Sequence, residues 1–368
     1  MKKIVISAVN FNEGGPLSVL KDCLESFRKI YKEQKIELTV FVHRRELVKE
    51  YLDDFCIIEY PLIKSSWLRR IYFEYFQCIR ISKKMGPSLW IALHDMTPNV
   101  RCPQIVYCHN PAPFYPLKLS DLFYDKTFFL FCLFYKFLYR INIRKNLFVI
   151  VQQQWIREEF EKNYKVKAVV AYPFNELRST PATAAASLKK RNSFTFFFPA
   201  FPRVAKNFET LLRAALELSK TTRGFELWLT ISGRENKYAE KLYHEFGQYE
   251  FIRFLGSQSR ADVFKLYIET DCMVFPSKLE TWGLPISEFK EFDRPMLLAD
   301  LKYAHEALGD YEQVKFFNAG DALELAGFMK SSIDHALIYD GNKAIRPPEP
   351  NFRNWDQLVC YITTYPGT

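Results

Sequence analysis

The sequence predicts an α/β protein of two domains, and three observations lead to this prediction. The chain has 368 residues, of which 48% are hydrophobic, and these numbers suit two hydrophobic cores better than one. Short apolar runs alternate with segments of helical periodicity from residue 3 onward. A small and polar stretch at residues 171–191 interrupts this alternation. We therefore expect one α/β domain before this stretch and a second after it.

The predicted first domain begins with a strand, a glycine turn and a helix. Residues 3–9 are an apolar run, the pair Gly14-Gly15 follows, and apolar side chains recur at helical spacing from Leu17 to Phe27. A glycine turn directly after a strand lets the backbone approach a ligand closely, as in nucleotide-binding α/β folds. Apolar runs at residues 36–42 and 56–60 are expected to form further strands.

Two later strands of the first domain end in a histidine. Residues 89–95 contain His94, and residues 104–114 contain His109. Because the carboxyl ends of strands line the binding crevice of an open α/β sheet, both histidines are candidates for ligand contact. The alternative for each is a hydrogen-bonded histidine with a structural role only.

The first half of the chain holds the whole basic excess. Residues 1–175 contain 27 Lys plus Arg and 17 Asp plus Glu, a balance of +10, whereas residues 176–368 contain 24 and 25, a balance of −1. This asymmetry predicts an anionic partner, such as a lipid surface or a diphosphate-linked acceptor. Solubility is the alternative explanation.

Two segments of the basic half combine cations with aromatic residues. They are residues 67–84 and residues 126–145. The apolar run at 128–134 is too short to cross a membrane. Either these segments form a surface that contacts an anionic membrane, or the apolar run belongs to a helix buried in the first domain.

The second domain is expected to start with a strand at residues 194–198. Lys206 lies shortly after it, at the start of the next predicted helix. Two further predicted strands lead to Gly233 and Gly256. The helix predicted at residues 260–270 then leads to the most informative stretch of the chain.

That stretch, residues 272–288, predicts a strand, a loop and the start of a helix. Residues 272–275 are apolar, Gly283 allows a turn, and Pro285 suits the first turn of a helix. Unpaired backbone N–H groups and the helix dipole make such a start a candidate phosphate site. Glu280 and Glu288 flank it. Carboxylates accept hydrogen bonds from hydroxyls, so this pair suits sugars on either side of a diphosphate.

Residues 274–288 resemble the donor-site signature of the family 4 retaining glycosyltransferases, also called group 1 glycosyl transferases, which carry two Glu separated by seven residues. Here these are Glu280 and Glu288, and the neighbouring Phe-Pro-Ser and Glu-Thr-Trp-Gly-Leu-Pro match nearly position for position. The resemblance covers most of the chain and is strongest in residues 194–310. It implies the GT-B fold, in which two doubly wound, Rossmann-like domains face a cleft.

The resemblance also implies what each domain binds. Residues 1–175 would bind the acceptor and residues 190–350 the nucleotide sugar, while a helix at 351–364 would pack back toward the first domain. Lys206 would contact the donor diphosphate. The family usually has an Arg five residues earlier, where this chain has Phe201, and Arg203 is the candidate substitute.

The implied site residues fall into two groups. Glu280 would hold the transferred sugar, Glu288 the ribose, and His109 the sugar from the opposite domain. The catalytic candidates are therefore His109, Lys206 and Glu280. The donor-binding candidates are Gly15, Arg203, Lys206, Gly233, Gly256, Glu280, Thr281, Trp282, Gly283, Leu284 and Glu288.

We therefore predict retaining transfer of a hexose from a nucleotide-diphosphate sugar to a glycan or polyprenyl-diphosphate-linked acceptor, in surface polysaccharide biosynthesis. No metal or other cofactor is expected, because the chain has no Asp-x-Asp motif and Lys206 with the loop amides can stabilise the departing diphosphate. A GT-B nucleotide-sugar epimerase is one alternative. A noncatalytic GT-B protein that binds glycans or a partner is another, favoured by the missing Arg. Nucleic-acid binding rests on charge alone and is not expected.

The cysteines and the first residues predict a reduced, cytoplasmic protein. None of the eight cysteines forms a C-x-x-C pair, and the Met-Lys-Lys-Ile start runs directly into a predicted strand without a secretory signal. If the basic half meets a membrane, we expect it to do so at the inner face.

Overall fold

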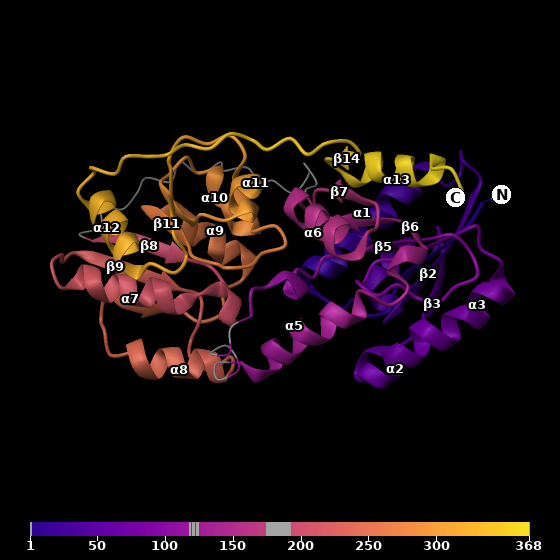
Figure 1. Cartoon of the computed structure of the whole chain (residues 1–368), viewed down its shortest axis with the longest axis horizontal. Helices are drawn as coiled ribbons and strands as arrows, with labels where there is room; N and C mark the ends of the chain where they lie inside the picture. Colours follow the sequence, from indigo (N-terminus) through magenta and orange to yellow (C-terminus); the bar gives the residue numbers. More distant parts are fainter. Residues whose placement is uncertain (1, 118, 120–121, 123–124, 174–192, 368) are drawn as a thin grey trace. The chain divides into compact units, whose positions relative to one another are not determined.

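The computed structural model describes residues 2–117, 119, 122, 125–173 and 193–367, and it divides into two compact units. The first unit contains Met1–Asn110, Phe134–Arg178 and Pro347–Thr368, and the second contains Pro111–Leu133 and Ser179–Arg346. Most of the predicted polar stretch at 171–191 lies outside the described residues. Each unit is an α/β fold around one sheet (Figure 1).

The sheet of the first unit has eight strands in the order β14-β7-β6-β5-β4-β1-β2-β3. All of its strand pairs are parallel. The strands are β1 (Lys2–Ala8), β2 (Ile36–Val42), β3 (Cys56–Glu59), β4 (Leu89–Ala92), β5 (Gln104–Tyr107), β6 (Asn146–Val151), β7 (Ala168–Ala171) and β14 (Asn351–Phe352).

The helices of the first unit connect these strands. The longest is α1, and two of the shorter ones form one nearly continuous segment with a π-helical turn, η3, between them. They are α1 (Gly14–Ile30), η1 (Arg45–Tyr51), η2 (Ile63–Ser65), α2 (Trp67–Tyr72), η3 (Phe73–Gln77), α3 (Cys78–Met85), η5 (Ile143–Lys145), α6 (Gln154–Tyr164) and α13 (Trp355–Thr364). Helix α5 (Lys126–Leu138) begins in residues of the second unit and ends in residues of the first.

The sheet of the second unit has six parallel strands in the order β10-β9-β8-β11-β12-β13. The strands are β8 (Phe194–Phe198), β9 (Phe225–Leu229), β10 (Ile252–Phe254), β11 (Cys272–Phe275), β12 (Met296–Ala299) and β13 (Val314–Phe317). The helices are η4 (Ala112–Phe114), η7 (Val204–Lys206), α7 (Phe208–Ser219), α8 (Lys237–Phe246), α9 (Arg260–Glu269), α10 (Leu284–Lys290), α11 (Lys302–Leu308) and α12 (Ala322–Ile333).

The two sheets share one topology. In the first, the chain builds outward from β1 to β3 on one side and from β4 to β7 on the other. In the second, it builds from β8 to β10 and from β11 to β13. Ligands of doubly wound sheets bind outside the carboxyl ends of the two strands where the order reverses. The topology therefore points to the ends of β1 and β4 in one unit and of β8 and β11 in the other.

Central strands are buried on both faces, as parallel sheets require. All four residues of β4 and all four of β11 are buried, and both strands are apolar throughout. This explains why these strands appear in the sequence as continuous apolar runs rather than as alternating patterns.

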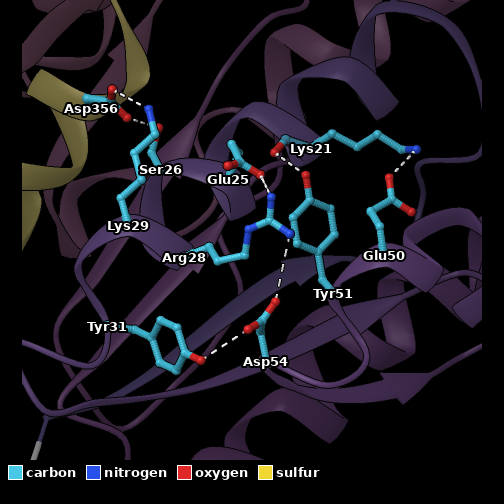
Figure 2. Close-up of polar contacts among 10 residues, drawn as sticks. All are labelled: Lys21, Glu25, Ser26, Arg28, Lys29, Tyr31, Glu50, Tyr51, Asp54 and Asp356. Atoms are coloured by element: carbon cyan, nitrogen blue, oxygen red, sulfur yellow. Dashed lines mark hydrogen bonds and ion pairs between the residues drawn. The ribbon is translucent and has the colours of Figure 1, made fainter.

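The end of the chain returns to the first unit. The sequence predicted a helix from 351, but Asn351–Phe352 instead extend the sheet as β14 beside β7, and α13 begins at Trp355. Helix α13 lies beside α1, and Asp356 accepts hydrogen bonds from Ser26 Oγ at 2.6 Å and Lys29 Nζ at 2.7 Å (Figure 2). Apolar residues of α13 join the core cluster beneath α1.

Helix α5 is partly buried and partly exposed. Phe128 and Phe131 are half-buried and pack against Tyr115 and its neighbours, whereas Phe134 and Phe137 are 40% and 60% exposed. Within the apolar run 128–134, the structure therefore places Phe134 at the surface, whereas Phe128 and Phe131 pack against the cluster.

Candidate functional site

Two loops meet at the strand reversal of the second unit. One loop follows β8 and ends at η7, and the other follows β11 and ends at α10. The backbone N–H of Lys278 donates to the carbonyl of Ala205 at 2.7 Å, which joins the two loops directly. The sequence positions predicted for the donor therefore lie on connected segments.

Lys206 and Glu280 form an ion pair across these loops. Lys206 Nζ donates to Glu280 Oε1 at 2.5 Å, and the two side chains are 22% and 11% exposed. Lys206 Nζ also lies 5.8 Å from the centroid of the Phe275 ring at the end of β11. Since an ammonium group has three donors, one bond to Glu280 leaves capacity for an anion.

Asn207 explains why the Lys206 loop has a defined shape. It adopts the left-handed backbone conformation at φ +58°, which Asn tolerates better than most residues. Its side chain, in a fully buried residue, donates to the carbonyls of Pro276 and Ala319 at 3.0 and 2.8 Å. These bonds tie the start of α7 to the loops after β11 and β13.

Trp282 and Gly283 shape the entry into α10. Gly283 has φ +89°, a conformation that side chains disfavour, and α10 then begins at Leu284, one residue before Pro285. Trp282 is buried, and its Nε1–H donates to Ser287 Oγ at 3.0 Å. The predicted turn at Gly283 is thus observed, with an indole underneath it rather than facing solvent.

Glu288 projects from α10 toward α9. Its carboxylate accepts from Arg260 Nη2 at 3.0 Å and from the Tyr267 hydroxyl at 3.2 Å, and the side chain is 15% exposed. Burial raises the pKa of Glu288, and Arg260 and Tyr267 oppose this rise without cancelling it. A partly buried carboxylate with two fixed donors is a rigid acceptor for a further hydroxyl.

Arg203 lies in the loop after β8 and is exposed. Its guanidinium carbon is 5.9 Å from the centroid of the ring of Phe201, the residue that stands where an Arg was expected. Phe201 itself is 55% exposed. The cation and the ring therefore form one exposed pair next to the Lys206 turn.

Gly233 and Gly256 follow β9 and β10, and both have positive φ, +89° and +74°. A Cβ at Gly233 would lie 2.5 Å from Cβ of Tyr243, so helix packing alone requires glycine there. The N–H groups of Ser232 and Gly233 donate to the Glu235 carboxylate at 2.6 and 3.0 Å. Local backbone conformation and packing thus explain these glycines, which the sequence did not reveal.

His109 follows β5 in the first unit. Its side chain is 23% exposed, and Nε2 lies 3.4 Å from Asp95 Oδ2. Its ring centroid is 5.7 Å from that of Phe11, in the loop after β1. The structure therefore brings the predicted glycine turn and the predicted histidine to the same strand reversal, where Gly15 lies in the first turn of α1 with open space at its Cβ position.

His94, the other candidate, is 1% exposed and is surrounded by side chains of the first unit. Its Nε2 lies 3.1 Å from Ser7 Oγ and 3.3 Å from Glu74 Oε1, and its carbonyl accepts from Arg70 Nη2 at 2.6 Å. Burial, with Arg70 nearby, lowers the pKa of His94, and burial raises the pKa of Glu74 to about 8 despite Arg70. At neutral pH the contact between His94 and Glu74 is therefore a neutral pair.

Among the residues that the structure describes, no group of three or more His, Cys, Asp and Glu side chains is placed to hold a metal ion. Within the same ranges, none of the helices has both the length and the apolar character needed to span a membrane.

Comparison with known proteins now adds to this geometry. Residues 181–334 match the family described as glycosyl transferases group 1. The match lies in the second unit and covers less than half of the chain. A related sequence, the O-antigen chain mannosyltransferase RfbU of Salmonella typhimurium, is 23% identical over 253 residues, which cover 67% of this chain and 66% of RfbU, just under two thirds of its length.

Solved structures show the fold of the chain. The lipopolysaccharide outer core galactosyltransferase WaaB, in its apo form, superposes with a TM-score of 0.60 at 15% identity and covers 92% of both chains. Anabaena Alr3699/HepE, in complex with UDP-glucose, superposes with a TM-score of 0.57 at 16% identity over 91% of this chain and 90% of its own. The predicted GT-B fold is confirmed.

The sequence did not single out several residues that the structure places near the two strand reversals. Arg260 and Tyr267 lie on a helix for which only position and length were predicted, so their contacts with Glu288 were unforeseen. Asn207 could have been noticed, because Asn directly after a predicted turn favours a left-handed conformation. Asp95 directly follows His94 in the sequence, but nothing there indicated its hydrogen bond to the backbone of His109.

Proposed function

We propose that this glycosyl transferase moves a hexose from a nucleotide-diphosphate sugar to a glycan or lipid-linked acceptor, with retention of configuration, in surface polysaccharide biosynthesis. RfbU is an O-antigen chain mannosyltransferase and WaaB a lipopolysaccharide outer core galactosyltransferase, which supports a polysaccharide acceptor. The UDP-glucose bound to HepE supports a nucleotide-sugar donor. The observation that carries the proposal is the pair of joined loops bearing Lys206 and Glu280.

The chemistry requires a group that stabilises the charge of the departing nucleoside diphosphate. Lys206 is a fixed cation at the strand reversal, and its remaining donors suit phosphate oxygens. We assign the backbone N–H groups of Thr281 to Leu284 to the same diphosphate, with Arg203 as an additional cation. The exposed pair of Arg203 and Phe201 supports that last assignment.

The two glutamates receive different tasks. Glu280 lies beside the phosphate-binding ammonium, which suits a contact to hydroxyls of the transferred sugar. Glu288, on α10, accepts hydrogen bonds from Arg260 and Tyr267 of α9. A carboxylate fixed in this way suits contact with the ribose hydroxyls. His109 keeps the role that the family resemblance gives it, contact with the donor sugar.

Donor binding tests this proposal. A panel that starts with UDP-glucose and GDP-mannose should raise the melting temperature of the wild type for at least one nucleotide sugar, because a ligand of the native state stabilises it. Losing a charge-assisted hydrogen bond costs about 1.5–3 kcal/mol, so Lys206→Ala and Glu288→Ala should each weaken binding at least about tenfold.

A matched control is Lys220→Ala, which removes a cation at the opposite end of α7. It should bind the nucleotide sugar as the wild type does. Unchanged affinity in both Lys206→Ala and Glu288→Ala, in folded protein, contradicts the assignment. Epimerisation of the donor sugar without any acceptor would instead favour an epimerase.

Metal independence is part of the proposal, because Lys206 and the loop amides provide the positive charge that a metal ion would otherwise supply. Transfer should persist after treatment with a chelator. A complete loss of transfer that Mn²⁺ or Mg²⁺ restores would remove this part.

We also propose that the first unit contacts anionic membranes through a surface formed by α2, η3, α3 and the end of α5. Trp67 contacts Phe134 with ring centroids 5.2 Å apart, which joins the two predicted segments. Leu68 is 78% exposed, a high value for so large an apolar side chain. The exposed members of this surface are Trp67, Leu68, Arg69, Tyr72, Phe76, Arg80, Lys83, Lys84, Phe134, Lys136, Phe137 and Arg140.

Arg70 does not belong to this surface, although its sequence position suggested that it would. It is 4% exposed and donates to the carbonyl of His94. The charge variant for this surface should therefore replace Arg69, Lys83 and Lys84 by Gln and leave Arg70 in place.

Sedimentation with anionic liposomes tests membrane contact. Each cation near an anionic surface contributes about 1 kcal/mol, so the triple variant should sediment much less at low salt, and the wild type should dissociate at high salt. A variant that replaces Lys220, Lys265 and Lys330 of the second unit loses the same charge and should still sediment. A wild type that ignores the liposomes at low salt would end the membrane proposal.

A further inference from the structure

Asp95 occupies a special position at the strand reversal of the first unit. It lies three residues after the end of β4 and adopts φ +68°, a conformation that Asp tolerates when local hydrogen bonds compensate. Its backbone N–H donates to the carbonyl of Tyr107, the last residue of β5, at 3.1 Å. The residue is 5% exposed. A buried carboxyl group is therefore held between the ends of two neighbouring strands.

The two carboxylate oxygens of Asp95 have different surroundings. Oδ1 accepts from the backbone N–H of His109 at 2.8 Å, from that of Asn110 at 3.0 Å and from the Tyr139 hydroxyl at 2.9 Å. Oδ2 lies 3.4 Å from Nε2 of the His109 ring. One oxygen thus fixes the backbone on which His109 stands, and the other faces its imidazole.

Packing holds the His109 ring as well. Phe11 lies 5.7 Å away between ring centroids and Tyr107 lies 6.1 Å away. Tyr139, whose hydroxyl contacts the carboxylate, is itself buried among aromatic rings of the first unit. The position of Asp95 is therefore rigid on the side away from the ring.

A carboxylate next to one ring nitrogen decides where a neutral histidine carries its proton. The contact of 3.4 Å is long for a hydrogen bond, but such contacts in ligand-free sites are often long and shorten in the complex. The alternative is that Asp95 only caps the backbone N–H groups after β5. That role uses Oδ1 alone and does not account for the approach of Oδ2 to the ring.

We propose that Asp95 is a positioning residue for His109: it anchors the backbone of His109 and holds the proton of the neutral ring at Nε2. This inference rests on the proposed function, in which His109 contacts the donor sugar. With its Nε2–H directed at Asp95, the ring would meet the donor sugar in one fixed orientation and one protonation state. Asp95 acts through His109 and touches neither substrate itself.

The protonated nitrogen can be observed without any ligand. Long-range ¹H–¹⁵N spectra of protein with ¹⁵N-labelled histidine, recorded at pH 8, distinguish Nε2–H from Nδ1–H, and His109→Gln assigns the signals. The wild type should show Nε2–H at His109. A wild type with Nδ1–H overturns the proposal without any further variant.

Asp95→Asn separates the two roles of the side chain. Asn keeps an acceptor oxygen for the three donors at Oδ1 but places a neutral amide beside the ring, so the His109 signals should shift toward a mixture of both neutral forms. Asp356→Asn, the same change of residue type on α13, is the matched control and should leave these signals in place. Identical His109 signals in folded Asp95→Asn and wild type contradict the proposal.

Turnover provides the functional readout. With UDP-glucose and GDP-mannose as probes and release of the nucleoside diphosphate as the measurement, Asp95→Asn should lower kcat about 10- to 100-fold, with little change in KM, because a misplaced group acts on the reacting complex. If the wild type turns over neither sugar, the proposed function is in question while the spectra still decide the role of Asp95. If both spectra and kcat are unchanged, Asp95 is structural only.

Discussion

The strand reversals of the two units have the same topology but differ in how far their charged side chains are exposed. Between β8 and β11, charged side chains remain partly exposed, with Lys206 at 22% and Glu280 at 11%. Around the end of β4 in the first unit, Glu74 and Asp95 are 0% and 5% exposed, and the neighbouring His109 is 23% exposed. The same sheet order therefore supports an accessible ionic site in one unit and an internally satisfied one in the other.

This difference follows from what each site would bind. A diphosphate needs cations that it can reach, and Lys206 is paired by a single carboxylate that leaves its other donors available. A neutral sugar hydroxyl needs a rigid donor or acceptor rather than a net charge. Burying the carboxylates around His109 fixes the imidazole without adding an exposed charge next to it.

The strongest test of this comparison is Glu280→Gln. If Glu280 grips the sugar mainly in the transition state, the variant should lose about 100- to 1,000-fold in kcat while affinity for UDP stays near that of the wild type. Removing the carboxylate also frees Lys206 from its partner, so UDP affinity should not fall. Steady-state turnover and calorimetry of UDP binding measure the two quantities. Full transfer activity would remove Glu280 from the site.

The buried group in the first unit should show its effect in stability rather than in binding. Because burial raises the pKa of Glu74 to about 8, the folded state holds this proton more tightly than the unfolded chain does. The stabilisation is complete below the ordinary Glu range and is lost as the pH rises toward 8. The loss between pH 5 and pH 8 should be on the order of 3 kcal/mol.

Glu74→Gln, which cannot ionise, tests this pH dependence. Urea unfolding at pH 5, 6, 7 and 8 should show the stability of the variant rising relative to that of the wild type as the pH increases, because only the wild type loses the contribution of protonated Glu74. Glu37→Gln replaces an exposed glutamate of β2 and should retain the wild-type profile. Parallel profiles of wild type and Glu74→Gln would mean that Glu74 ionises normally in the folded protein.

The sequence predicted the accessible site better than the buried one, for a physical reason. Gly283, Lys206 and the two glutamates lie in loops and helix starts, where residue type reflects local backbone and ligand chemistry. Glu74 lies within a helical run, where a glutamate is normally a solvent-exposed residue, and its burial depends on a π-helical turn that periodicity does not predict. His94 and His109 had equivalent strand-end positions, and the family resemblance favoured His109; the three-dimensional contacts show the buried environment of His94.

The accessible site should also respond to pH, but less strongly. Burial raises the pKa of Glu288, so lowering the pH protonates this carboxylate earlier than an ordinary one and removes an acceptor for the ribose. Affinity for UDP-glucose, whose diphosphate does not titrate in this range, should fall about tenfold or less between pH 7 and pH 5. Glu288→Gln should abolish the dependence and Glu280→Gln should retain it. Calorimetry at three pH values decides whether Glu288 is the titrating group.

The comparison predicts the smallest effect for charges that lie far from both strand reversals. The ion pair between Lys29 and Asp356 joins α1 to α13, but both side chains are 51% exposed, and such pairs contribute about 0.2–1 kcal/mol (Figure 2). Asp356→Asn keeps an acceptor for Ser26 and loses only the charge, so its free energy of unfolding should fall by less than about 1 kcal/mol. Lys29→Gln should cost a similar amount, and the double variant little more, since both remove one interaction. A loss above about 2 kcal/mol would show that α13 depends on this polar contact rather than on its buried apolar face.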